Sequence, residues 1–307
     1  ENQRRPAHTN RLTKAHVRMQ PPTAAPHYIL AFSCQNHPGI VAAVTSTLVQ
    51  LGCDITDGQQ FDDHLSGRFF LRLEFRPVRI DIGEAGFHAG LAPVMASLDA
   101  DWTVRDLARR KRVLLLASTS DHCLRELLYR WNLGEMPMEP VAVVSNHERS
   151  TFGELYGVPF HHLPVFPETK PQQEAALLGL IQLERVDLVV LARYMQILSP
   201  ELTMALEGRC INIHHSFLPG FKGARPYHQA YARGVKIIGA TAHYVTSDLD
   251  EGPIIAQAVE RVSHRDTPDA LIRKGRDIER RVLAEAVLAH LEDRVMLREG
   301  TTVVFPA

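Results

Sequence analysis

The sequence has little cysteine, and its cysteines do not pair at short spacing. No CxxC occurs, which excludes a zinc ribbon, and four scattered thiols in 307 residues exclude a disulfide framework. Scattered thiols are typical of a reducing compartment, so we expect a cytoplasmic protein. The four residues are Cys34, Cys53, Cys123 and Cys210.

The sequence also lacks an excess of charge and a long apolar run. Lys plus Arg number 34 and Asp plus Glu number 35, which leaves a formal charge of -1. A near-neutral chain has no general attraction for nucleic acid or anionic lipid, and we expect neither as a partner. No run of about 18 uncharged apolar residues occurs, so no membrane helix is predicted. An apolar share of 45% indicates a globular chain, and 307 residues indicate about two domains.

Signatures of common cofactor and metal sites are missing. No GxGxxG follows the first strand of either half, and neither GxxxxGK[ST] nor HExxH occurs. The pairs His161–His162 and His214–His215 point to opposite faces if they lie on strands, which disfavours a shared metal. We therefore expect no metal and no permanently bound cofactor.

The N-terminal third divides into a tail and a small domain. Residues 1–26 are basic and poor in large apolar groups, and we expect a flexible tail. Residues 27–108 follow the order strand, helix, strand, strand, helix, strand, which is the ferredoxin-like split βαβ unit. After the first strand, Tyr28–Ser33, Asn36 is expected to cap a helix with Pro38 in its first turn. The unit has no clustered acids, bases or nucleophiles, which indicates a binding or assembly module.

Residues 109–307 alternate short apolar strands with helices, a pattern typical of a doubly wound, mostly parallel α/β sheet. In such sheets the site lies outside the carboxyl ends of the strands. The basic run Ala108–Arg112 predicts a solvated linker, because no aromatic residue is interleaved. A long final helix is expected to start at Thr267 and Pro268. The predicted strands are Val113–Ala117, Val141–Ser145, Asp187–Ala192, Cys210–His214 and Ile237–Val245.

One predicted strand carries two polar side chains suited to acyl chemistry. Asn212 and His214 are two residues apart, so both project from one face of the strand. Ile211 and Ile213 take the other face and are expected to pack. An amide can donate to a carbonyl oxygen that becomes an oxyanion, and an imidazole moves a proton near neutral pH. A polar pair satisfied by backbone groups explains the spacing equally well.

A second polar segment follows the next predicted strand. His243 lies on that strand, and the loop that leaves it carries Asp248, Asp250 and Glu251. An aspartate there can orient His214 and hold an attacking water. Acids in a loop are also typical of a solvated surface, and the position at a strand end is what favours a site.

From Val113 to Phe305 the sequence closely resembles the folate-dependent formyltransferase-type domain. Asn212, His214 and Asp250 match the catalytic asparagine, histidine and aspartate of that family. Residues Cys34–Phe75 are similar to modules of the ACT family, so the whole chain resembles the formyltetrahydrofolate deformylase family. The longest stretches that carry the resemblance are 187–198 and 239–246.

The resemblance implies hydrolysis of 10-formyltetrahydrofolate to formate and tetrahydrofolate without a metal, which would balance the one-carbon pool and supply formate for purine synthesis. Asp250 and His214 would hold the attacking water, and Asn212 with protonated His214 would stabilise the oxyanion. The residues assigned to substrate binding are Ala192, Arg193, Tyr194, Met195, Leu198, His215, His243 and Asp248.

The same resemblance implies an effector and an assembly for the N-terminal module. A small amino acid such as glycine or methionine would bind around Asn36, Gly39 and Ile40. Modules of this type pair between chains, so a homo-oligomer is expected, with a tetramer as one arrangement.

Two other functions remain open from the sequence. An amine formyltransferase, for example one acting on glycinamide ribonucleotide, typically has Pro after the catalytic His, where this sequence has His215. It also has a glycine-rich phosphate site where this sequence has Ser118–Cys123. Both differences favour water as the acceptor. The intact catalytic residues argue against a non-catalytic amino-acid sensor. Three roles remain open for Lys222 and Arg225. They border the entrance for a second substrate, they bind the glutamate tail of the folate, or they are solvent-exposed charges of a loop.

Overall fold

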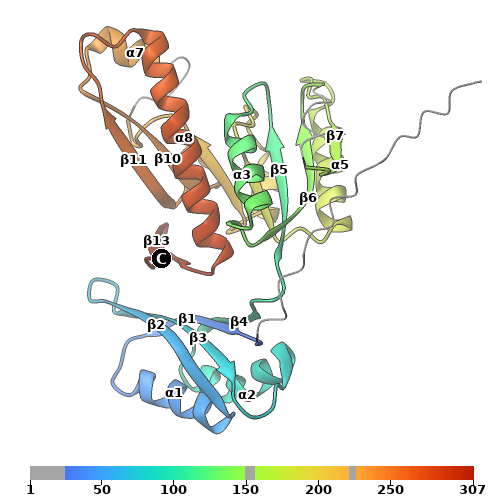
Figure 1. Cartoon of the computed structure of the whole chain (residues 1–307), viewed down its shortest axis with the longest axis vertical. Helices are drawn as coiled ribbons and strands as arrows, with labels where there is room; N and C mark the ends of the chain where they lie inside the picture. The colour runs from blue at the N-terminus through green and yellow to red at the C-terminus, as the bar shows by residue number, and fades with distance from the viewer. Residues whose placement is uncertain (1–24, 149–155, 221–225) are drawn as a thin grey trace, which may run out of the picture.

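The computed structural model describes residues 25–148, 156–220 and 226–307. These residues form a smaller antiparallel domain and a larger α/β domain, which lie one above the other in Figure 1. All but the last two residues of the predicted tail lie outside the described residues, as do Lys222 and Arg225. Among the helices described, none is long and apolar enough to cross a membrane.

The smaller domain has the element order predicted from the sequence. Its strands pair antiparallel in the order β2-β3-β1-β4, and both helices cover one face, on the lower side in Figure 1. This is the ferredoxin-like split βαβ arrangement. The elements are β1 (Tyr28–Gln35), α1 (Ile40–Gln50), β2 (Cys53–Asp63), β3 (Arg68–Pro77), α2 (Gly83–Ser97) and β4 (Asp101–Asp106).

The first helix starts later than the sequence predicted. Helix α1 begins at Ile40, its N-cap is Gly39, and no side chain in the described part of the protein caps it. The expected roles of Asn36 as cap and of Pro38 in the first turn are therefore wrong. The Asn36 backbone N–H donates to the Gly67 carbonyl at 2.8 Å, which holds this residue in the preceding turn. Asn36 and Gly39 are exposed, whereas Ile40 is 2% exposed and packs in the domain core.

The sheet face opposite these helices is also partly buried, because the C-terminal end of the chain lies against it. Arg72 on β3 is 3% exposed and donates from Nε to the Glu292 carbonyl at 3.1 Å. Asp63 at the end of β2 pairs with Arg298 at 2.7 Å. These contacts join the two domains far from the linker in sequence.

The larger domain contains one seven-stranded sheet, in the order β11-β10-β9-β8-β5-β6-β7. Its strands are β5 (Lys111–Ala117), β6 (Met138–Ser145), β7 (Phe160–His162), β8 (Leu188–Leu191), β9 (Cys210–His214), β10 (Ile237–Tyr244) and β11 (Ile254–Arg261). Its helices are α3 (His122–Leu133), α5 (Lys170–Leu183), α6 (Pro200–Ala205), α7 (Pro226–Arg233) and α8 (Pro268–Leu291). The hairpin of β12 (Val295–Arg298) and β13 (Thr301–Val304) follows.

The prediction of a doubly wound, mostly parallel sheet is confirmed. Strands β5 to β9 run parallel, and β10 is antiparallel to both of its neighbours. One face of the sheet packs against α3, α7 and α8, and the other packs against α5 and α6. The prediction missed β7, β11, α7 and the terminal hairpin, and it did not foresee the reversal of β10, because strand periodicity carries no direction.

The linker is shorter than the sequence predicted, because Lys111 and Arg112 already belong to β5. Lys111 Nζ lies 2.6 Å from one carboxylate oxygen of Asp293, and Arg105 of β4 pairs with the other oxygen at 2.6 Å. Two cations from the two domains thus share one carboxylate. The interpretation of this run as a solvated linker is wrong for these residues.

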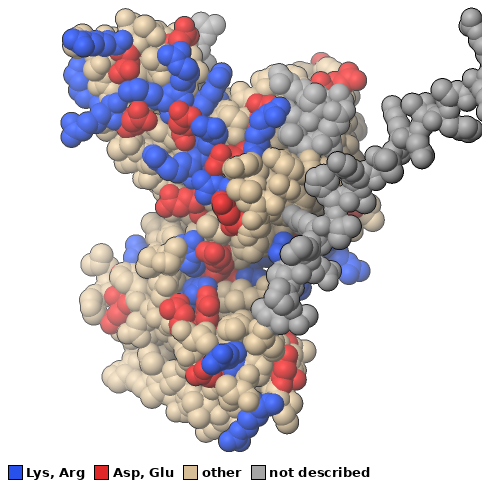
Figure 2. Space-filling view, in the orientation of Figure 1, with Lys and Arg blue, Asp and Glu red and all other residues tan. Residues whose placement is uncertain are grey.

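Helix α8 starts as predicted and forms one wall of the site. The Thr267 hydroxyl accepts the Ala270 backbone N–H at 3.3 Å, and Pro268 is the first helical residue. On the face shown in Figure 2, Lys and Arg side chains gather over this helix with acidic side chains among them. Its opposite face, with Ile278 and Val282, is buried against the sheet.

Candidate active site

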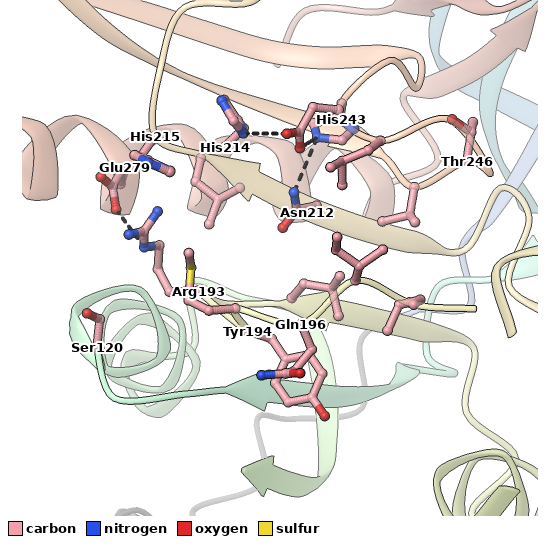
Figure 3. A pocket seen from close by; sticks show the side chains of 18 of the residues that line it. Ser120, Arg193, Tyr194, Gln196, Asn212, His214, His215, His243, Thr246 and Glu279 are labelled. Atoms are coloured by element: carbon pink, nitrogen blue, oxygen red, sulfur yellow. Dashed lines mark hydrogen bonds and ion pairs between the residues drawn. The ribbon is translucent and has the colours of Figure 1, made fainter. Parts of the chain in front are cut away.

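A cavity of about 630 Å³ lies at the carboxyl ends of β8 and β9. The loop after β10 and the side of helix α8 complete its walls, and Figure 3 shows many of the side chains that line it. This is where a doubly wound sheet places a site, because loops from neighbouring parallel strands diverge there.

Strand β9 presents Asn212 and His214 to this cavity. Alternation puts both on one face, while Ile211 and Ile213 belong to the hydrophobic core, as the spacing predicted. The strand is central, with β8 on one side and β10 on the other, so its position is fixed from both edges. His214 is only 6% exposed.

Asp250 lies beside His214. Its Oδ2 is 3.1 Å from His214 Nδ1, so the neutral imidazole carries its proton on Nδ1. The hydrogen bond from His214 holds the pKa of Asp250 well below its usual range against the effect of burial. Within the described residues, His214 Nε2 is buried and has no hydrogen-bond partner. This nitrogen is therefore available to a reactant.

The loop that carries Asp250 folds back tightly onto β10. Asp250 itself adopts φ 59°, a left-handed conformation that costs free energy outside glycine. A Cβ at Gly252 would lie 1.8 Å from the Tyr244 carbonyl oxygen, so only glycine permits this approach. The close return is what brings the carboxylate to His214.

His243 on β10 contacts both polar partners. Its Nδ1 lies 2.8 Å from the Tyr244 carbonyl, which can only accept, so Nδ1 is the protonated nitrogen. Its Nε2 lies 3.3 Å from Asn212 Nδ2 and 3.7 Å from Asp250 Oδ1. One N–H of the Asn212 amide is thereby engaged, and the second remains available.

The residues predicted to bind substrate divide between the cavity wall and the core. Seven of the eight line the cavity: Arg193, Tyr194, Met195, Leu198, His215, His243 and Asp248. The Ala192 side chain does not, because it is fully buried in the core at the end of β8. Met195 is 57% exposed, whereas Tyr194 is buried and accepts a hydrogen bond from Gln173 at 3.1 Å.

His215 lies on the same cavity as His214, contrary to the expected opposite orientation. Strand β9 ends at His214, so the alternation of a strand no longer holds for the next residue. The two ring centroids are 5.0 Å apart. Burial, and then the cation of Arg193, lower the pKa of His215 to about 4, which keeps the ring neutral at neutral pH.

Sequence reasoning missed a buried group at this end of the cavity. Glu279 of α8 is 1% exposed, accepts from Tyr227 at 2.7 Å and lies 2.8 Å from His122. The sequence does indicate that Glu279 is buried, because it lies next to Ile278 and three residues before Val282, on the apolar side of the predicted helix.

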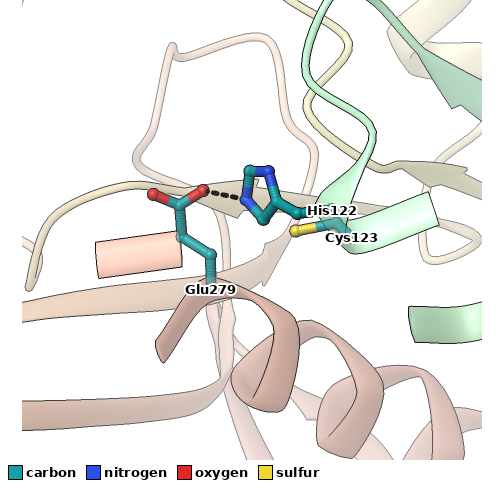
Figure 4. Close-up of side chains that lie close together, drawn as sticks. All are labelled: His122, Cys123 and Glu279. Atoms are coloured by element: carbon teal, nitrogen blue, oxygen red, sulfur yellow. Dashed lines mark hydrogen bonds and ion pairs between the residues drawn. The ribbon is translucent and has the colours of Figure 1, made fainter. Parts of the chain in front are cut away.

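His122, Cys123 and Glu279 are the residues among those described that could hold a metal ion together (Figure 4). Their ligand atoms lie within 4.8 Å of one another. The carboxylate, however, already faces the Arg193 cation at 3.4 Å, and burial raises the pKa of the Cys123 thiol well above its usual value. Neither condition favours a thiolate and carboxylate metal site.

Comparison with known proteins follows the same division of the chain. Residues 111–287 match the family model described as formyl transferase. A curated formyltetrahydrofolate deformylase of Corynebacterium sp. (strain P-1) is 48% identical over 282 residues, which cover 90% of this chain and 97% of that protein. The chain belongs to the formyltetrahydrofolate deformylase family. The Bacillus subtilis (strain 168) member is 47% identical over 90% of this chain and 93% of its own length.

Solved structures separate the family from its neighbours. The formyltetrahydrofolate deformylase of Burkholderia mallei has a TM-score of 0.87 and 48% identity, and covers 91% of this chain and 99% of that one. The glycinamide ribonucleotide transformylase 1 of Symbiobacterium toebii reaches a TM-score of 0.60 and 32% identity. It covers 64% of this chain and 95% of that one. This part of the chain is about as long as the larger domain alone.

Proposed function

We propose that the chain hydrolyses 10-formyltetrahydrofolate to formate and tetrahydrofolate. The observation that carries this proposal is the convergence of Asn212, His214 and Asp250 on one cavity, where a buried imidazole nitrogen has no hydrogen-bond partner among the described residues. Family membership over nearly the whole chain supports the same reaction.

The reaction begins at the formyl carbon. A water oxygen bonds to this carbon while His214 Nε2 takes one of its protons, and Asp250 stabilises the resulting imidazolium through Nδ1. The carbonyl oxygen becomes an oxyanion, to which the second N–H of Asn212 donates.

The second half of the reaction releases both products. The bond between the formyl carbon and N10 breaks, and N10 receives the proton that His214 carried. The formic acid loses its proton at neutral pH and becomes formate, since carboxyl groups ionise near pH 4.

One end of the cavity, which is formed by apolar residues after β8, suits the folate ring system. Tyr194, Met195 and Leu198 supply apolar wall after β8, and Asp248, in the loop after β10, lines the same cavity. Such a mixture of apolar surface with few polar groups is typical of small-molecule sites. We assign the pterin to this end.

Water is favoured over an amine as acceptor. Ser118–Cys123 carries no glycine cluster that could bind the phosphate of such an amine substrate. The transformylase neighbours also lack a counterpart to about a third of the chain, since they cover 64% of it.

The remaining proposals concern the regulation, the assembly and the cellular location of the protein. The smaller domain has the topology expected of an ACT module, and we propose that it binds an amino acid such as glycine or methionine around Asn36, Gly39 and Ile40 and mediates homo-oligomer formation. We place the protein in the cytoplasm, because its four cysteines are free and buried. There its formate would supply purine synthesis.

The test is formate release from 10-formyltetrahydrofolate by the full chain without any amine. We expect turnover with one formate per tetrahydrofolate. An absolute requirement for glycinamide ribonucleotide would overturn the hydrolase assignment in favour of the transferase.

A further inference from the structure

Arg193 carries a mostly buried guanidinium whose donors are unused. The side chain is 14% exposed, and a guanidinium has five N–H donors. Among the hydrogen bonds of the described residues, none comes from these nitrogens, and Nε is fully buried. Nε faces the Glu279 carboxylate at 3.4 Å, so the donors left for a further anionic partner are the two terminal nitrogens.

Glu279 anchors the guanidinium from behind. Its Oε2 lies 3.4 Å from Arg193 Nε and 2.8 Å from His122 Nε2, and its Oε1 accepts from Tyr227 at 2.7 Å (Figure 4 shows the contact with His122). Burial raises the pKa of Glu279, but the hydrogen bond from His122 and the Arg193 charge outweigh it, so the carboxylate stays ionised. The pair positions Arg193 without using its terminal nitrogens in hydrogen bonds.

The backbone around this pair is built for it. Arg193 adopts φ 66°, a left-handed conformation that persists in non-glycine residues only where the surroundings impose it. A Cβ at Gly275 would lie 2.0 Å from the Tyr227 hydroxyl oxygen, so glycine at this turn of α8 lets the tyrosine reach Glu279. The left-handed backbone at Arg193 and the glycine within helix α8 are each unfavourable locally, and both serve the grouping of Arg193 and Tyr227 around Glu279.

This end of the cavity adjoins the reacting centre. Arg193 and His214 line the same cavity, and the neutral His215 ring stands next to His214. In Figure 3, Arg193 and Glu279 lie toward the left, Thr246 lies at the right, and His214 lies between them, next to His243. The ionised Asp250 repels any carboxylate formed at His214, whereas Arg193 attracts it.

We propose that Arg193 is a binding site for a small carboxylate and receives the formate made by hydrolysis, with Glu279 as its positioning residue. The planar fork of a guanidinium matches the two oxygens of a carboxylate. The two products then leave in opposite directions, formate toward Arg193 and tetrahydrofolate along the apolar wall. This inference rests on the proposed hydrolysis. A carboxylate of the folate glutamate tail has the same chemistry, and the experiment separates the two sources.

The first arm titrates sodium formate into the full-length free enzyme by calorimetry. We expect formate to bind R193Q at least about tenfold more weakly than the unmodified chain, and R193K to lie between them, because lysine keeps the charge but not the fork. The matched control is R276Q, since Arg276 is exposed on the same cavity, and it should change the affinity by less than about twofold. Equal formate affinity in R193Q and the unmodified chain overturns the proposal, and R193K supplies the comparison if R193Q does not fold.

The second arm compares KM for 10-formyltetrahydrofolate with KM for the same compound lacking the glutamate. If Arg193 binds formate, R193Q should leave the ratio of the KM values for these two substrates unchanged. A rise in KM confined to the glutamate-bearing substrate, with formate binding unaltered, assigns Arg193 to the folate tail and overturns the proposal. Binding to the free enzyme does not need turnover, so an inactive chain that still binds formate through Arg193 would contradict only the proposed hydrolysis.

Discussion

His243 Nε2 lies 3.3 Å from Asn212 Nδ2, and this contact sets the orientation of the amide that faces the reacting centre. The Tyr244 carbonyl holds the proton of the imidazole on Nδ1, at 2.8 Å, so Nε2 can only accept while the ring is neutral. The Asn212 amide is thereby oriented before substrate arrives, and preorganised donors are the ones that stabilise an oxyanion most.

The first prediction is that His243 acts largely through Asn212. Asn212→Ala should lower kcat for formate release by about 10²–10³-fold, the usual effect of losing one oxyanion donor. His243→Ala should lower kcat by about 10-fold or more, and the double variant should fall well short of the product of the two losses. Steady-state kinetics with circular dichroism as a fold check measures all three. Fully multiplicative losses would show that His243 acts independently of Asn212.

The second prediction concerns Asp250, whose Oδ2 lies 3.1 Å from His214 Nδ1. Asp250→Asn should lower kcat by about 10³-fold or more, because an amide can turn its N–H toward Nδ1 and favour the tautomer with the proton on Nε2. Asp248→Asn is the matched control in the same loop, since Asp248 is exposed at the folate end. It should raise KM and keep kcat within about threefold. Equal losses of kcat in both variants would remove Asp250 from the chemistry.

Parts of this site could be predicted because they are local in sequence. Asn212 and His214 are two residues apart on a strand, and period-2 alternation alone puts them on one face. Asp250 comes after the next strand in a loop, and strand-end position favours a site there. The resemblance to the formyltransferase-type domain then joined the three residues, which spacing could not do.

The contacts at the Arg193 end of the cavity could not be predicted, because they join residues that are distant in sequence, whereas the burial of Glu279 follows from its place on the helix. Glu279 meets His122 across 157 residues and Tyr227 across 52. No short-range pattern encodes such a meeting, which depends on how α3, α7 and α8 pack on one face of the sheet. His215 was misjudged for a related reason, since alternation applies only as far as the strand, which ends at His214.

The third prediction is that His290 makes the chain sensitive to acid. Burial, and then the Lys111 cation, lower the pKa of His290 to about 3, while an unfolded histidine has a pKa near 6.5. Between these values the unfolded state binds a proton that the folded state does not, so the free energy of unfolding falls as pH falls from about 6.5 to 3. The loss is up to about 1.4 kcal/mol per pH unit.

His290→Asn should make the dependence of stability on pH shallower by up to about one proton in this window. Asparagine can still accept from the Tyr244 hydroxyl, which lies 2.7 Å from His290 Nδ1. His264→Asn serves as the control, because this histidine is exposed, and it should leave the slope unchanged. Urea unfolding midpoints at several pH values measure the slope. An identical slope in His290→Asn and the unmodified chain would contradict the assignment.

The fourth prediction is that Asp293 holds the two domains together. Arg105 of the smaller domain and Lys111 of the larger one both lie 2.6 Å from its carboxylate, and their side chains are 11% and 12% exposed. Asp293→Asn leaves two nearly buried cations side by side, which should reduce the free energy of unfolding by about 3–5 kcal/mol. Asp277→Asn removes a carboxylate that pairs with Arg280 on the exposed side of α8, and it should cost less than about 0.5 kcal/mol. Calorimetric unfolding measures both, and a loss in Asp293→Asn no larger than in Asp277→Asn would show that the shared carboxylate does not stabilise the contact between the domains.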